Sequence, residues 1–131
     1  MFILSLIISV IVPITVIICG NLLKHNTPAE INSIYGYRTK RSMSSQEAWE
    51  FANKLCGGMW IKGGIISLPL SLICVLIICI RFGSRTGIGA ATILEIVQVG
   101  LMLSTIYFVE RQLKRNFEDK NTQKGKADDK N

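Results

Sequence analysis

The chain has 131 residues, a formal net charge of +6 and a hydrophobic fraction of 49%. This length leaves room for one domain. The hydrophobic residues do not follow the short periods of a soluble fold. They form three blocks of about 20 residues, the length that crosses roughly 30 Å of hydrocarbon. We therefore predict an all-α integral membrane protein with three transmembrane helices, and the distribution argues against a soluble enzyme.

The first block, residues 2–23, contains no charged residue. A cleaved signal peptide would need a basic segment before its apolar core and a small-residue cleavage site. No Lys or Arg precedes Lys24, and the block is too long. We therefore predict a retained transmembrane helix, which Pro13 kinks because its ring removes a backbone donor.

The second and third blocks, residues 61–80 and 88–109, form a predicted antiparallel pair. A short loop at residues 81–87 joins them, and its Gly83, Ser84 and Gly87 suit a tight turn. Within the second block, Pro69 predicts another kink, which neighbouring small residues can accommodate.

The positive charges predict an orientation. The segment between the first two spans and the C-terminal tail together carry 13 Lys and Arg residues, whereas the 81–87 loop carries two. Cytoplasmic segments hold such an excess, so we expect the N-terminus outside and the C-terminus in the cytoplasm of a multi-pass protein. Attraction to anionic lipid explains this charge without nucleic acid. The tail, residues 117–131, lacks apolar periodicity and is predicted to be disordered.

Residues 24–60 are far longer than a connection requires. Their first part, up to Met43, is predicted to be an ordered loop in which Gly36 has a positive φ or approaches another segment closely. A helix is predicted from Ser44, because Ser44 and Glu47 have capping-box spacing. Its apolar face carries two tryptophans, which favours an amphipathic helix in the membrane interface. The alternative is a helix that packs against the spans.

This segment resembles the SdpI family of small bacterial membrane proteins. The resemblance covers residues 27–70 and depends on the pattern Asn32-x3-Gly36-Tyr37-Arg38-Thr39, then Ser42, then Trp49-x2-Ala52-Asn53. It implies a bacterial cell-membrane protein that gives immunity to, or senses, a secreted membrane-active peptide toxin. It also implies signalling to a cytoplasmic regulator. The motif residues are the expected partner-binding site: Asn32, Gly36, Tyr37, Arg38, Thr39, Ser42, Trp49, Ala52 and Asn53.

Two polar residues interrupt the third block. Glu95 is well inside the span, and Gln98 follows one helical turn later. A carboxylate at this depth needs a partner or a functional reason. Arg81 or Arg85 could reach it from the 81–87 loop, and the alternative to such a pair is a protonated Glu95. One interpretation is a polar link between helices. The other is a small homo-oligomeric transporter or channel that uses both residues.

The chain offers little for catalysis. We find no paired nucleophile and base, no phosphate-binding glycine loop and no metal-ligand spacing. The four cysteines have no CxxC spacing. We therefore expect no enzyme activity, no catalytic residue, no metal and no cofactor. The expected partners are the lipid bilayer, a peptide toxin outside and a cytoplasmic regulator inside.

Overall fold

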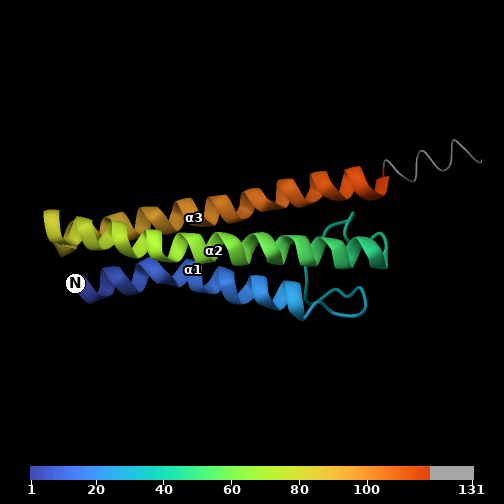
Figure 1. Cartoon of the computed structure of the whole chain (residues 1–131), viewed down its shortest axis with the longest axis horizontal. Coiled ribbons are helices and arrows are strands. Elements are labelled where there is room, and N and C mark those ends of the chain that lie inside the picture. Colours follow the sequence, from blue (N-terminus) through green and yellow to red (C-terminus); the bar gives the residue numbers. More distant parts are fainter. Residues whose placement is uncertain (119–131) are drawn as a thin grey trace, which may run out of the picture.

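A computed structural model describes residues 1–118 of the chain and places their backbone in an all-helical bundle. Helix α1 spans Phe2–His25, α2 spans Gln46–Phe82, α3 spans Ser84–Leu113, and a short π-helical turn, η1, spans Lys114–Glu118. The three long helices lie side by side in an up-down-up arrangement (Figure 1). The described residues contain no β-strand. Of the predicted disordered tail, Phe117 and Glu118 lie in η1, and the rest lies outside the described residues.

All three long helices are long and apolar enough to cross a membrane. The three predicted blocks fall within α1, α2 and α3, so the expected three-span membrane fold is confirmed. Helix α2 has 37 residues, which at 1.5 Å each give about 55 Å, well beyond the roughly 30 Å of a bilayer core. Its first turns therefore extend past the end of α1, where the connecting loop covers them (Figure 1). We call this the basic end, because both Lys- and Arg-rich segments adjoin it.

The predicted interfacial helix is not present as a separate element. Residues from Gln46 onward are the first turns of α2, continuous with the second span. Their apolar face packs inside the bundle, where Ala48, Ala52 and Cys56 form one core with Val109 and Leu113 of α3. The alternative expectation, a helix packed against the spans, describes this arrangement. The helix also begins one residue later than predicted, because the Ser45 hydroxyl accepts a hydrogen bond from the Ala48 amide.

Two glycines of α2 lie against α1 between the first turns of α2 and its membrane-spanning part. A Cβ at Gly57 would lie 2.5 Å from the Gly20 carbonyl oxygen of α1, and one at Gly64 would lie 2.4 Å from Ile17 Cγ1. Small residues allow such close backbone approach in a membrane. These glycines therefore allow α1 and α2 to pack closely along a continuous α2.

The opposite end of the bundle is held by a tighter turn than predicted. Helix α2 continues to Phe82 and α3 starts at Ser84, so that Gly83 alone, with φ +88°, makes the connection. The expected loop at 81–87 is wrong because Gly87 already belongs to α3. A Cβ at Gly87 would lie 2.1 Å from Cys79 Sγ, so this glycine allows the two helices to meet immediately after the turn.

Candidate functional site at the basic end

The loop between α1 and α2, residues 26–45, folds back over the first turns of α2. The indole nitrogen of Trp49 donates a hydrogen bond to the Pro28 carbonyl at 3.1 Å. The Gln46 amide nitrogen donates to the Ala29 carbonyl at 2.6 Å. These two side chains of α2 thus fix the position of the start of the loop, which contains neither helix nor strand.

Gly36 packs directly on Trp49. Its φ is +121°, and a Cβ there would lie 2.6 Å from Trp49 Cη2. Trp49 itself is fully buried. The prediction for Gly36 is therefore confirmed in both of its forms, a positive φ and a close approach, and the close neighbour is another motif residue.

Asn53 joins the loop to the helix. Its Oδ1 accepts a hydrogen bond from the Tyr37 backbone amide at 2.7 Å, and its Nδ2 donates to the Trp49 carbonyl at 2.8 Å. The side chain is fully buried. A side-chain amide supplies both a donor and an acceptor, so Asn53 satisfies two buried backbone groups at once.

Tyr37 extends the connection to α3. Its side chain is 8% exposed, and its hydroxyl lies 3.2 Å from the Ile106 carbonyl and 3.3 Å from Glu110 Oε1. The single hydroxyl proton can be donated to either acceptor. Burial, together with the nearby Glu110 carboxylate, raises the pKa of Tyr37 well above its ordinary value. Tyr37 is therefore a neutral donor that joins the loop to the end of α3.

Ser42 closes the second half of the loop. Its hydroxyl donates to the Tyr37 carbonyl at 2.7 Å and accepts from the Thr39 amide at 2.8 Å. The Ser42 amide in turn donates to Thr39 Oγ1 at 3.1 Å. The motif residues Gly36, Tyr37, Thr39, Ser42, Trp49, Ala52 and Asn53 thus form one packed unit, which we call the motif frame.

Sequence reasoning missed Arg41. Its guanidinium makes ion pairs with Glu110 at 3.0 Å and Glu118 at 2.8 Å, and these contacts raise the pKa of Arg41. They link the loop to α3 and η1. The partners are far away in sequence, and no local spacing indicates such a pair.

The other two motif residues lie outside the frame's interior. Asn32 makes a local turn, in which its Oδ1 accepts from the amides of Ile34 and Tyr35. Arg38 is exposed, and it makes no ion pair or side-chain hydrogen bond with any residue of 1–118. Arg38 is therefore a charged motif residue that the fold itself does not use.

Arg38 stands at the edge of a lateral groove of about 500 Å³. One wall is the loop from Ile34 to Thr39, and the other walls are the last turns of α1 and the turns of α3 at residues 102–106. Cys56 and Trp60 of α2 contribute to the lining. Apolar side chains dominate, and among residues 1–118 Arg38 is the only charged residue that lines the groove.

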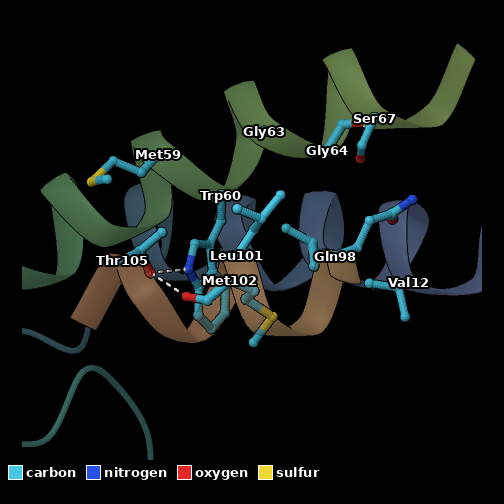
Figure 2. A pocket seen from close by; sticks show the side chains of 11 residues that line it. Val12, Met59, Trp60, Gly63, Gly64, Ser67, Gln98, Leu101, Met102 and Thr105 are labelled. Carbon is cyan, nitrogen blue, oxygen red and sulfur yellow. Dashed lines mark hydrogen bonds between the residues drawn. The ribbon is translucent and has the colours of Figure 1, made fainter. Parts of the chain in front are cut away.

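A smaller cavity of about 200 Å³ lies deeper in the bundle. Trp60 points into it from α2 and donates from its indole nitrogen to Thr105 Oγ1 at 2.9 Å (Figure 2). Gln98 and Val12 lie at its other side (Figure 2). Trp60 and Met102 line both hollows, so these two side chains stand between the groove and the cavity.

The structure places Glu95 and Gln98 in contact with the other helices. Glu95 Oε2 accepts a hydrogen bond from the Val12 amide of α1 at 3.1 Å, and the Gln98 amide nitrogen donates to Ser71 Oγ of α2. Neither Arg81 nor Arg85 pairs with Glu95, so that expectation is wrong. The reason is that Glu95 faces the middle of α1, where the amide of Val12, the residue before Pro13, is its partner. Within residues 1–118, Glu95 Oε1 and Gln98 Oε1 are buried without a hydrogen-bond partner.

Comparisons with known proteins agree with the motif. A model of the SdpI/YfhL protein family matches residues 29–109. The Bacillus subtilis (strain 168) protein called "Uncharacterized protein YfhL" is 44% identical over 57 residues, which are 44% of this chain and 52% of the relative. The chain thus spans about half the length of the curated relative that it matches. No solved structure matches it significantly. The resemblance inferred from the motif is therefore confirmed.

Proposed function

This chain belongs to the SdpI/YfhL family of proteins, and on that premise we propose that it protects a bacterium from a secreted membrane-active peptide toxin. In this proposal the protein binds its partners and does not turn over a substrate. The membrane-spanning bundle meets the peptide, and the basic end transmits its presence to a cytoplasmic regulator.

The observation that carries the proposal is the unpaired Arg38 on the motif frame. Seven motif residues hold one another through buried contacts, while Arg38 remains exposed and without a partner in the described chain. A guanidinium has a fixed fork of donors that suits carboxylate or phosphate groups. A rigid frame that presents such a group costs little ordering entropy on binding, which favours recognition as the role of this end.

The proposed orientation places the basic end in the cytoplasm. Within residues 1–118, Arg81 and Arg85 lie at the opposite end of the bundle, and the basic end carries Lys24, Arg38, Lys40, Arg41, Lys54, Arg111, Lys114 and Arg115. This distribution is the one that the positive-inside rule associates with a cytoplasmic face. Arg38 then faces cytoplasmic partners or the inner lipid leaflet.

Survival of a sensitive bacterium tests the function. Cells that express the wild-type protein should survive a secreted killing peptide of the class that the family counteracts, and cells with Arg38→Ala should not. Arg111→Ala is the matched control, because Arg111 is another exposed arginine at the same end and lies outside the groove. Equal membrane amounts of the three proteins, measured by immunoblot, exclude an expression effect. No protection by the wild type would refute the immunity proposal.

A second candidate function is transport through an assembly of several copies. The Glu95 Oε1 and Gln98 Oε1 atoms, which are buried without a partner within residues 1–118, favour it. Polar groups inside a span commonly mark the pathway of an ion or a substrate. Purified protein in liposomes should then pass protons or a small solute, and Glu95→Gln should abolish the flux. Background flux in both proteins would leave Glu95 as a polar link between α3 and α1.

A further inference from the structure

We propose that the lateral groove beside Arg38 binds one anionic phospholipid, with an acyl chain along the groove and the phosphate on the Arg38 guanidinium. This site shares Arg38 with the proposed immunity function but does not rest on it, since lipid binding can be measured without any peptide toxin. Its volume of about 500 Å³ is within the range of known ligand pockets, roughly 300 to 1,000 Å³.

The depth of the loop is the first argument. Ile34, Tyr35 and Gly36 line the groove together with Cys19 and Leu22 of α1. Part of the loop therefore reaches back to the last two turns of α1, a helix long and apolar enough to cross a membrane, although most of the loop lies past the end of α1 (Figure 1). Because Cys19 and Leu22 belong to a predicted span and Arg38 lies beyond its end, we place the groove where acyl chains meet the lipid headgroups.

The exposed side chains around the groove are the second argument. Ile34 is 89% exposed, although it lies in a polar turn held by Asn32. Leu103 and Ile106 of α3, and Leu22 of α1, are also exposed and contribute to the groove walls. Exposure of these apolar side chains to water is unfavourable, whereas contact with acyl chains removes them from water. We therefore infer that the groove opens to lipid.

Charge supplies the third argument and selects the headgroup. Arg38 is the only charged residue that lines the groove, no carboxylate neutralises it within residues 1–118, and it lies at the end of the bundle where lipid headgroups are expected. Arginine binds phosphate oxygens through paired hydrogen bonds, and basic pockets between membrane helices bind anionic headgroups. A zwitterionic lipid has the same phosphate but also a cation that Arg38 repels, so the site should prefer an anionic lipid.

Tryptophan fluorescence provides the test, because Trp60 lines the groove while Trp49 is sealed behind Gly36. The full chain is reconstituted in phosphatidylcholine vesicles that contain increasing fractions of either brominated phosphatidylglycerol or brominated phosphatidylcholine. Bromine quenches indole fluorescence on contact. Because one basic residue near a membrane surface contributes about 1 kcal/mol toward anionic lipid, we expect half-maximal quenching at an about five-fold lower fraction of the brominated anionic lipid.

Three variants assign the effect. Arg38→Ala should remove the preference for the anionic lipid, Arg111→Ala should retain it, and Trp60→Phe should remove the preferential quenching. Circular dichroism confirms that each variant is helical. Equal quenching by the two lipids in the wild type overturns the proposal and leaves the groove to a peptide occupant. A preference that survives in Arg38→Ala also overturns it, because general surface charge then explains the result.

Discussion

The two ends of the bundle are built in different ways. At the basic end, Asn53, Tyr37 and Arg41 connect a 20-residue loop to two helices through hydrogen bonds and ion pairs. At the opposite end, Gly83 alone joins α2 to α3, and small side chains pack next to it. A single glycine suffices to close a hairpin, so the connection alone does not require the polar contacts at the basic end, which agrees with the recognition role proposed above.

Among the substitutions that test this comparison, Gly36→Ala should lower the stability of the protein most. The new methyl group would meet the Trp49 ring at 2.6 Å, in a backbone conformation with positive φ. Overpacking and left-handed backbone together cost about 3 kcal/mol. Thermal unfolding in detergent should show a large fall in the melting temperature. Gly58→Ala is the control, because nothing lies within 4 Å of a Cβ there, and it should be neutral or slightly stabilising.

Asn53→Ala should have the next largest effect. It leaves the Tyr37 amide and the Trp49 carbonyl without their hydrogen-bond partners inside a packed region. An orphaned buried group costs about 1–3 kcal/mol, so we expect a loss of about 2 kcal/mol in the free energy of unfolding. Proteolysis of the loop at residues 26–45 should accelerate in parallel. Unchanged stability and cleavage would show that Asn53 does not hold the loop.

Tyr37 should make stability depend on alkaline pH. Its folded-state pKa is raised, so the folded protein favours the protonated hydroxyl. This contribution is complete below the ordinary tyrosine pKa of about 10 and is lost as the pH rises above it. The melting temperature of the wild type should therefore fall relative to Tyr37→Phe between about pH 8 and about pH 11. A constant difference over this range would contradict the assigned role.

Ser5→Ala at the opposite end should have the smallest effect. The Ser5 hydroxyl donates to Phe2 of its own helix at 2.7 Å and lies 3.2 Å from Cys79 Sγ. Replacement removes a local hydrogen bond and leaves no backbone group of another element without a partner, so we expect less than about 1 kcal/mol. Unfolding in detergent, measured beside Asn53→Ala, compares the two ends directly. A larger loss for Ser5→Ala would reverse the comparison.

The sequence predicted the three spans because uncharged blocks of about 20 residues have one stable solution in a bilayer. It also identified the motif residues and the unusual backbone of Gly36. The separate interfacial helix was wrong, since an apolar face with two tryptophans suits the membrane interface and the bundle interior equally well, and only the packing against α3 decides between them. The contacts of Arg41 with Glu110, and of Glu95 with Val12, connect residues distant in sequence and need the tertiary structure.

Two exposed arginines without partners in residues 1–118, one at each end, allow the most direct test of the central claim. Arg38 lies on the motif frame and Arg85 lies near the Gly83 turn. The measurement is the dose of killing peptide that halves survival of cells expressing the wild type, Arg38→Ala or Arg85→Ala at equal membrane amounts. Our account predicts that Arg38→Ala falls to the dose of cells without the protein, whereas Arg85→Ala matches the wild type. The reverse order, or equal protection by both variants, would contradict a functional basic end.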